Sequence, residues 1–489
     1  MHSSGWDTAL SRTAFGSYGR MFPDLPACPH RGIHDIIELG ALGGRMDDTD
    51  NSVGDNTRIP AGFSALGQFI THDVSFDASP MPLGSVVPDT ITNRASPRFD
   101  LDNVYGGGVG GHTMLYPLPD RLRFALGDGG HDMPRMPDST VISPDPRDDN
   151  NLPLSQLHLA FMRFHNAVID ALLDKTITTA TGGALDDPPE DANTTLLDNP
   201  SLGRLVEKDN YLNHAFAQAQ RLVTWHYQWM IVNEYLPLIC DPVVLTHVLE
   251  TGPTLFPRPD APPFIPVEFT GGAFRYAHAV LRNEYRLNDH TVLPMFVDTP
   301  EGGPRVDLRG GTVAPEHAID WSYFFHTRDD REPQYERLIT TRFPTALLDL
   351  PVRGVPGLRA GALSQEMSSL AVRDLCRSEM QGIPSGQDVA TALGYEPLTD
   401  TELGTTGPVY LLWYVLREAE LHAGGQHLGP VGSRIVAETI LGLLDADPWS
   451  YRSTRRHWTP TIAARGNKFG MADIVTIADT GTVHQANPR

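Results

Sequence analysis

Two side chains that can hydrogen-bond to a ligand, those of Gln68 and His72, lie four positions apart in AGFSALGQFITHDVSFD, residues 61–77. Apolar residues recur here at helical spacing and Pro60 precedes them, so the pattern predicts a helix of about four turns. Side chains four apart share one helix face, whereas Asp73 projects roughly 100° away from His72. This helix would therefore serve two separate sites. The alternative is a packed core histidine beside a solvated aspartate.

Oxygen-bearing side chains alternate in SPRFDLDNVYG, where Ser96, Asp100 and Asp102 precede a glycine. Calcium binds six to eight oxygen ligands, so this pattern is a candidate calcium site. The alternative is a loop of solvated carboxylates, which is the more common case. Arg147, which stands among aspartates in DPRDDNN, is another candidate for chemistry, and its alternative is a surface ion cluster.

A histidine on an apolar helix face is the third feature. His278 follows two glycines in VEFTGGAFRYAHAVLRNEYRLND, within a helix expected over 269–283. Asp374 lies inside another apolar helix, expected over 363–380, where a carboxylate is costly to bury unless it is paired. A carboxylate that accepts the ring N–H of a metal-bound histidine is a common arrangement, so we hypothesise that the two side chains meet. The alternative for His278 is a packed core histidine.

The elements that must position these residues are mostly helices. Helical periodicity extends over several further segments: 153–173, 202–238, 387–393, 408–421 and 430–446. Strand signals are few and short, and residues 1–60 and 78–151 are rich in loop-forming residues. The sequence thus predicts a mainly α protein with one large domain and long ordered loops.

Composition narrows the function classes. The chain has 489 residues, of which 40% are hydrophobic, so it can bury a sizeable core. A formal net charge of −22 argues against nucleic-acid binding, and the absence of an 18-residue apolar run argues against a membrane span. Three widely separated cysteines do not suggest a disulfide framework. The first residues lack a signal-peptide pattern, so we expect a cytoplasmic protein, or one exported by a route that needs no signal peptide.

Taken together, the motifs resemble those of a known family. GQFITHD, the loop ending VYGG, the Arg147 loop with LHLAFMRFHN, AFRYAH and GIPSGQDVA occur in the order found in animal-type haem peroxidases. This is the peroxidase–cyclooxygenase superfamily, which includes myeloperoxidase and lactoperoxidase. The resemblance extends from about Arg58 to Ile474, and LGPVGSRIVAETILGLLDADP resembles the bacterial branch. It implies a mainly helical fold, with a loop-rich arm over 1–57, the peroxidase domain over 58–475 and a tail over 476–489.

The resemblance also implies the residues of a haem site. On the distal side it implies His72 as acid–base catalyst, with Gln68 and Arg147 beside it. On the proximal side it implies His278 as the iron ligand and Asp374 as the acceptor of its ring N–H, where most members have an asparagine.

Two further groups follow from the same resemblance. Arg275 and Arg377 would bind the haem propionates. A calcium ion would be bound by five residues, with Arg98 contributing its carbonyl oxygen: Asp73, Ser96, Arg98, Asp100 and Asp102.

The implied activity is reduction of hydrogen peroxide through a ferryl intermediate, with oxidation of halide or small organic donors. A haem-dependent fatty-acid oxygenase of the same superfamily is the alternative, but such enzymes place a radical tyrosine three residues before the proximal histidine. Here Arg275 stands at that position, and Tyr276 is only two residues before His278. A non-catalytic haem-binding protein is a further alternative, which the retained Gln68, His72 and Arg147 disfavour.

Haem attachment is expected to be non-covalent. The mammalian relatives form two haem esters, at positions that correspond to Thr71 and Asn150, and a sulfonium link at the position of Asn151. None of these three side chains carries the required carboxylic acid or thioether. The resemblance therefore implies haem b held by its axial ligand, by arginine contacts and by packing.

Overall fold

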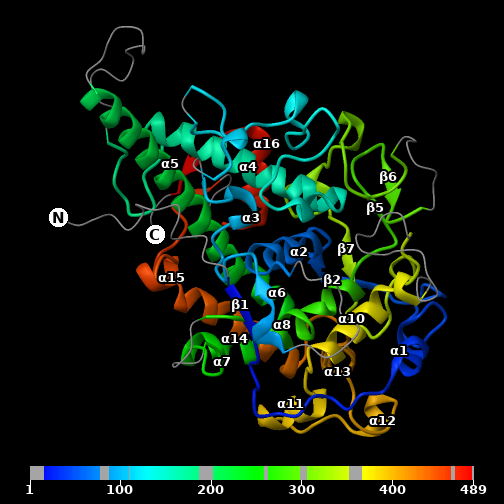
Figure 1. Ribbon diagram of the computed structural model, residues 1–489. Helices are drawn as coiled ribbons and strands as arrows, with labels where there is room; N and C mark the ends of the chain where they lie inside the picture. The colour runs from blue at the N-terminus through cyan, green and yellow to red at the C-terminus, as the bar shows by residue number, and fades with distance from the viewer. Residues whose placement is uncertain are drawn as a thin grey trace.

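Helices dominate the computed structural model, which describes residues 16–77, 87–108, 111–119, 121–186, 202–257, 263–297, 305–351, 366–463 and 469–486. The mainly α fold expected from the sequence is thus confirmed. Figure 1 shows α2 in the middle of the molecule, with α4 and α16 on one side of it and α8, α10 and α13 on the other. None of the described helices is both long and apolar enough to cross a membrane.

The central helix α2, Gly62–Val74, is buried around almost its whole circumference. A helix that is apolar on most sides is a core helix rather than a surface helix. Phe69 of α2 stacks on Phe161 of α4, with ring centroids 4.7 Å apart. Side chains that α2 directs away from the apolar core therefore point into enclosed sites rather than into solvent.

The second core helix, α4, extends over Leu152–Leu173. Its first turn is capped by Asn151, whose side chain accepts a hydrogen bond from the Leu154 N–H, and Pro153 occupies a position where its missing N–H is not needed. The helix α16, Met471–Thr480, packs along α4. The sequence analysis did not predict α16, which crosses the expected domain boundary at residue 475.

The remaining helices surround this centre. Those before residue 252 are α1 (Ile33–Gly40), α3 (Asp102–Tyr105), α5 (Leu202–Met230), the π-helical turn η8 (Ile231–Tyr235), α6 (Leu236–Ile239) and α7 (Pro242–Thr251). Those after it are α8 (Val267–Thr270), η9 (Ala273–Arg275), α9 (Tyr276–Ala279), α10 (Leu370–Met380), α11 (Gly386–Ala392), α12 (Asp400–Leu403), α13 (Leu411–Ala423), α14 (Pro430–Ala446) and α15 (Tyr451–Thr454).

The strands are short and tie distant segments together. The three-stranded sheet has β1 (Gly16–Gly19) between antiparallel β3 (Thr92–Asn93) and parallel β4 (Ile265–Pro266). Three antiparallel pairs complete the set: β2 (Asp55–Pro60) with β7 (Tyr335–Arg337), β5 (Glu284–Arg286) with β6 (Val292–Pro294), and β8 (Ile462–Ala463) with β9 (His484–Gln485).

Most of the predicted helices are confirmed, but the single helix predicted over 269–283 is wrong. The helices expected over 153–173, 387–393, 408–421 and 430–446 coincide within a few residues with α4, α11, α13 and α14. The helix expected over 202–238 is present as α5, η8 and α6. Of the helix expected over 363–380, the part from Leu370 forms α10, residues 366–368 form the separate 3₁₀ helix η14, and residues 363–365 lie outside the described residues.

The helix expected over 269–283 is instead three short pieces, α8, η9 and α9. The break falls at Gly271 and Gly272, and Gly272 has φ −124° and ψ −98°, far from helical values. A side chain at Gly271 would collide with the Gln381 amide oxygen. That amide can move aside, but a side chain at Gly272 would lie 2.6 Å from the Glu268 backbone carbonyl oxygen, so glycine is required there, and two glycines weaken the helix enough to break it.

Candidate functional site

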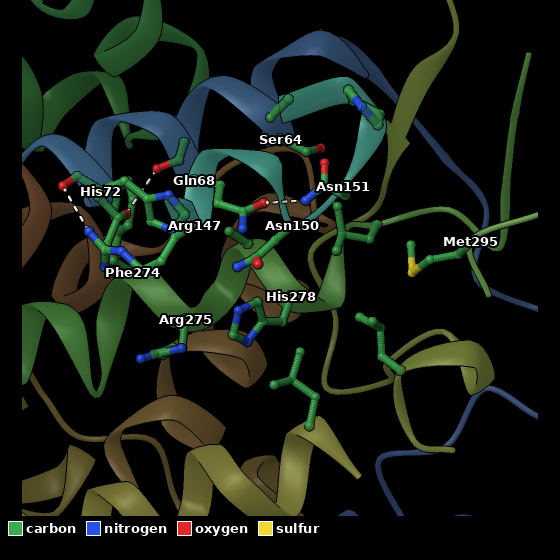
Figure 2. Close-up of a pocket in the computed structure, with 18 of the residues that line it drawn as sticks. Ser64, Gln68, His72, Arg147, Asn150, Asn151, Phe274, Arg275, His278 and Met295 are labelled. Carbon is green, nitrogen blue, oxygen red and sulfur yellow. Dashed lines mark hydrogen bonds between the residues drawn. The ribbon is translucent and has the colours of Figure 1, made fainter. Parts of the chain in front are cut away.

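A cavity of about 510 Å³ lies between α2 and α9. Its polar lining includes Gln68 and His72 from α2, and His278 from α9. Figure 2 shows His278 on the side of the cavity opposite Gln68 and Asn151. The structure thus brings together, around one cavity, the two histidines that the sequence analysis singled out 206 positions apart (278 − 72).

The first wall of the cavity is the C-terminal half of α2. Gln68 and His72 both face the cavity, as their four-residue spacing predicts. The side-chain oxygen Oε1 of Gln68 accepts a hydrogen bond of 3.0 Å from the Asn151 side-chain amide. This contact orients the Gln68 amide. Thr71 also lines the cavity, but its hydroxyl donates to the Gly67 carbonyl oxygen at 2.9 Å.

His72 is held from behind by a carboxylate. Its Nδ1 lies 2.7 Å from Oδ1 of Asp148, a side chain that is completely buried. With Nδ1 engaged there, Nε2 is the ring nitrogen left to face the cavity. The sequence analysis noted Asp148 only as a charged neighbour of Arg147. No signal in the sequence distinguished it, because Asp148 stands among other aspartates and is the only residue of the turn η6 that is buried.

Arg147 lines the same wall, in the short helix η6 (Pro146–Asp149). Its guanidinium pairs with Asp145 and donates hydrogen bonds to the backbone carbonyls of Ser75 (2.8 Å) and His72 (3.1 Å). It also stacks over the Phe76 ring, 4.0 Å from the centroid. These contacts attach a positive charge to the end of α2, beside His72.

Ligand atoms of His72, Asp145 and Asp148 lie within 4.8 Å of one another, which is close enough to bind a metal ion. Each acidic side chain already has a partner, however. Asp145 pairs with Arg147, and Asp148 accepts hydrogen bonds from imidazole groups. We therefore interpret this cluster as a network of ion pairs and hydrogen bonds rather than a metal site.

The opposite wall carries His278, and Asp374 of α10 lies behind it. His278 Nδ1 is 2.6 Å from Asp374 Oδ2, so the contact hypothesised from the sequence is present. The Arg275 guanidinium lies 3.4 Å from the other oxygen of Asp374. Burial alone would raise the pKa of Asp374, but the positive charges of His278 and Arg275 outweigh it and lower the pKa. The carboxylate is thus ionised and accepts the His278 N–H.

Arginines line one end of the cavity. Arg275 donates a hydrogen bond of 2.6 Å to the Thr270 carbonyl oxygen, and Arg377 pairs with Asp77 at 3.2 Å. Arg373 joins them in the lining. The other end of the cavity, which Met295 marks in Figure 2, is mainly apolar. The cavity therefore suits a molecule with an anionic edge and an apolar body.

The carboxylate that α2 directs away from the cavity lies in an acidic cluster. Asp73 is fully buried; its Oδ1 accepts the Asp102 N–H at 2.8 Å, and its Oδ2 has no hydrogen-bond partner. Burial, together with the nearby Asp100 and Asp102, raises the pKa of Asp73 well above its ordinary value. Ser96 donates to Asp100 at 3.0 Å. Acceptor oxygens that repel one another and include an unpartnered one fit a hard cation.

The Arg98 side chain points away from this cluster, and its Nε lies 3.8 Å from Asp447. This orientation leaves only the backbone carbonyl oxygen of Arg98 to serve as the calcium ligand that the resemblance implies. Figure 1 shows α3, which begins at Asp102, next to α2.

Comparison with known proteins decides the family. The family model described as animal haem peroxidase matches residues 78–320, a segment that includes Arg147 and His278. The chain belongs to the animal-type haem peroxidase superfamily. His72 and Asp374 lie outside the matched segment; His72 lines the cavity, and Asp374 lies behind His278, which lines it from the other side.

Solved structures of three proteins support the fold. Peroxidase A from Dictyostelium discoideum is 17% identical with a TM-score of 0.55, over 96% of this chain and 94% of that one. Fatty acid alpha-dioxygenase from Arabidopsis thaliana is 14% identical with a TM-score of 0.57, over 92% and 76% of the two chains. A variant of the Oryza sativa alpha-dioxygenase with palmitic acid is 14% identical with a TM-score of 0.57, over 95% and 81%. A search of the curated proteins found no match.

Members of the animal-type haem peroxidase superfamily are haem-binding oxidoreductases, and the cavity fits that cofactor. His278 offers an imidazole whose Nδ1 is bound to a carboxylate, which leaves Nε2 for the iron. Arg275 and Arg377 provide guanidinium groups for the propionates, and the apolar end suits the remainder of the porphyrin.

Proposed function

We propose that this protein is a haem peroxidase, which reduces hydrogen peroxide and oxidises halide or small organic donors. One observation carries the proposal. A second histidine, His72, faces the cavity opposite the expected iron ligand, and its Nδ1 is bound to the buried carboxylate of Asp148. An imidazole oriented in this way is suited to take a proton at Nε2 and to return it to a second oxygen nearby, which is what heterolysis of a peroxide requires.

The roles of the neighbouring residues follow from their positions. Haem, when bound, supplies the redox chemistry. His72 acts as general base on the peroxide and then as general acid on the departing oxygen. Arg147, fixed beside His72 by two backbone carbonyls, contributes a positive charge close to where negative charge develops. Gln68, oriented by Asn151, offers an amide to a ligand in the cavity.

We also propose that the haem is haem b, bound without a covalent link, and that the Asp73 cluster binds calcium. The Thr71 hydroxyl and the Asn150 and Asn151 amides line the cavity where the mammalian relatives have linking groups, and none of them can form an ester or a sulfonium. The unpartnered Asp73 Oδ2 supports a cation in the acidic cluster. We further propose that the chain belongs to the bacterial branch of the superfamily, and that it is cytoplasmic or exported by a route that needs no signal peptide.

A fatty-acid oxygenase is the second candidate, because two of the similar structures are alpha-dioxygenases and one end of the cavity is apolar. The position of Tyr276 argues against it. This side chain is buried and is absent from the described lining of the cavity, and its hydroxyl lies 3.4 Å from that of Tyr235. A tyrosyl radical there would not face a substrate in the cavity.

The test compares the two reactions on haem-loaded protein. We expect peroxide-dependent oxidation of a phenol such as guaiacol, and no oxygen uptake with palmitic acid. His72→Ala should keep fold and haem but lose roughly 10²–10⁴-fold in the rate at which peroxide changes the haem spectrum. His326→Ala, at an exposed histidine, is the control. Oxygen uptake with palmitic acid, or an unchanged rate in His72→Ala, would refute the proposal.

A further inference from the structure

We infer that Asp148 is a positioning residue for the peroxide reaction: together with His158 and Asn103 it keeps the proton of His72 on Nδ1 and the lone pair of Nε2 facing the cavity. This inference rests on the proposed function, since it concerns the histidine to which we assign the proton transfer. It gives roles to Asp148, His158 and Asn103, to which the sequence analysis assigned none.

Asp148 is surrounded by hydrogen-bond donors from three different elements. Its Oδ1 is 2.7 Å from His72 Nδ1 on α2. Its Oδ2 is 2.7 Å from His158 Nδ1 on α4 and accepts a hydrogen bond of 3.0 Å from the Asn103 amide on α3. Both Asp148 and His158 are almost completely shielded from solvent, with side chains 0% and 1% exposed. One carboxylate thus connects the three helices behind the cavity wall.

The charge of Asp148 decides which nitrogen of His72 carries the proton. Burial alone would raise the pKa of Asp148, but the hydrogen bonds from His158 and His72 outweigh it and lower the pKa to about 2. An ionised carboxylate can only accept hydrogen bonds, so both histidines must donate from Nδ1. Neutral His72 then has its lone pair on Nε2, the form that can accept a proton from a peroxide.

Hydrogen bonds to the second oxygen, Oδ2, prevent the Asp148 carboxylate from rotating. A carboxylate with a single partner can rotate about its Cβ–Cγ bond, whereas His158 and Asn103 hold Oδ2 from two directions. The His158 ring also packs edge-on against Phe69, with centroids 6.3 Å apart, and Phe69 lies on α2 one turn before His72. The orientation of His72 is therefore determined by α4 and α3 as well as by its own helix.

Asn103 extends this arrangement toward the acidic cluster. It directly follows Asp102, whose N–H binds Asp73 Oδ1, and Asp73 is the neighbour of His72. The α3 backbone thus holds both the residue beside His72 and the residue that helps to hold Asp148. A shift of α3 would disturb the His72 ring from two sides.

The experiment measures the position of the proton on His72 directly. Haem-loaded protein with ¹⁵N-labelled histidine is converted to its diamagnetic ferrous carbon monoxide form, and the ring ¹⁵N shifts of His72 are recorded. We expect a protonated Nδ1 and an unprotonated Nε2 in the wild type. In Asp148→Leu, which keeps the side-chain shape without an acceptor, both tautomers should be populated. A wild-type His72 protonated at Nε2, or an unchanged tautomer in the variant, would overturn the inference.

The peroxide reaction of the same proteins provides the second readout. Partners that orient a functional histidine typically contribute 10–100-fold, so Asp148→Leu should slow the peroxide reaction about 10–100-fold, which is less than His72→Ala. Asp149→Leu is the matched control, because the neighbouring carboxylate binds Arg135 and no histidine; its tautomer and rate should match those of the wild type. An equal loss of rate in Asp149→Leu would show a general effect of the loop and overturn the inference.

Two outcomes separate this inference from the proposed function. If Asp148→Leu does not fold, the ¹⁵N measurement on the wild type and on His158→Phe still decides, since loss of His158 should broaden the orientation of Asp148 and mix the His72 tautomers. A wild type that fails to react with peroxide would refute the peroxidase proposal. The tautomer measurement needs no peroxide, and therefore tests the hydrogen-bonded arrangement independently.

Discussion

At the level of single residues, both histidines that face the cavity are held by the same kind of contact. Each Nδ1 is bound to a buried aspartate: His72 to Asp148 at 2.7 Å and His278 to Asp374 at 2.6 Å. A carboxylate that accepts the Nδ1–H makes Nε2 of the imidazole more basic than an amide would. The reason is that its negative charge pulls on the Nδ1 proton and leaves more electron density on the ring. In the proposed function the same contact serves two purposes, proton transfer by His72 on one side of the cavity and iron ligation by His278 on the other.

The aspartate behind His278 leads to a prediction about redox potential. Asp374→Asn should raise the ferric/ferrous potential of the bound haem, since a neutral amide gives the ligand less electron density with which to stabilise the ferric state. Spectroelectrochemical titration of both proteins measures the difference. Glu379→Gln is the control on the same helix, because Glu379 binds the Tyr410 hydroxyl instead of His278. An unchanged or lower potential in Asp374→Asn would contradict the role of Asp374.

At the level of elements, α2 serves two sites with two adjacent residues. His72 faces the cavity, and Asp73 faces the acidic cluster next to α3. Gly67 allows this helix to lie close to its neighbours: a side chain there would come within 2.6 Å of the Tyr235 hydroxyl. Because one helix carries both His72 and Asp73, a change that disorders the acidic cluster should also disorder the His72 side chain.

The acidic cluster predicts that a bound cation supports both stability and haem binding. Asp100→Ala should lower the melting temperature and the haem occupancy in parallel, since a cation would no longer neutralise the buried Asp73. Calorimetry and the ratio of haem to protein absorbance measure the two effects. Asp128→Ala, at an exposed residue of the 3₁₀ helix η5 (Asp128–Gly130), should change neither. Metal analysis that finds less than one calcium per chain in protein never exposed to a chelator would count against the site.

The strand β7 contributes a buried acid behind α2. Glu336 is 2% exposed; one of its oxygens accepts a hydrogen bond of 2.7 Å from Ser64, and the other has no partner. Burial raises the pKa of Glu336 to about 8, although the Ser64 hydroxyl opposes this effect. A neutral carboxylic acid is therefore the stable form of this side chain in the folded protein near neutral pH.

This acid predicts a loss of stability with rising pH. In the unfolded chain Glu336 ionises near its ordinary value, whereas the folded chain keeps the proton until about pH 8. Its contribution to the free energy of unfolding is therefore complete below the ordinary value and falls, by up to about 1.4 kcal/mol per pH unit, as pH rises toward 8. Urea unfolding at pH 5, 6.5 and 8 should show this slope in the wild type and a smaller one in Glu336→Gln.

The matched control is Glu332→Gln, at a 79% exposed side chain in the same segment. It should keep the pH dependence of the wild type. If the wild type and Glu336→Gln differ by the same free energy at all three pH values, Glu336 titrates alike in both states and the prediction is wrong.

On the scale of the whole molecule, the cavity is built from segments far apart in the chain. Its walls come from α2, the loop around η6, the broken helix α8–η9–α9, the strand region near Met295, and α10. Almost all of its lining residues carry neutral or positive side chains, and Asp77 is the one carboxylate among the described lining residues. Asp77 is paired with Arg377.

The shortage of carboxylates predicts that haem is extractable. Acidified butanone should remove haem from denatured protein completely, since ester formation requires a carboxylic acid at the porphyrin edge. Asp148 and Asp149 are bound to His72 and Arg135, respectively, and do not line the cavity. Mass spectrometry of the polypeptide should show no added haem mass. A haem-modified peptide that contains Asp77 or Met295 would show that the attachment is covalent.

Local sequence was enough to determine a large part of this protein. The four-residue spacing of Gln68 and His72 fixes their common direction on α2, and the periodicity of apolar residues locates α4, α13 and α14 within a few residues. Both features depend only on helix geometry and on which side chains avoid water. The ordered motifs likewise indicated the superfamily that the family model confirmed.

Tertiary structure decided which side chains meet. His72 and Asp148 are 76 positions apart, and His278 and Asp374 are 96 apart, so no helical period relates them. The contact between His278 and Asp374 was a hypothesis from the sequence. The hydrogen bonds from His158 and Asn103 to Asp148 were not predicted. The break at Gly271 and Gly272 likewise lies against distant segments, with Gln381 just after α10 close to Gly271 and Leu411 of α13 close to Gly272. Helix direction is a local property, but the partner of a buried charge is chosen by the packing of the whole chain, because only packing removes the water that would otherwise solvate it.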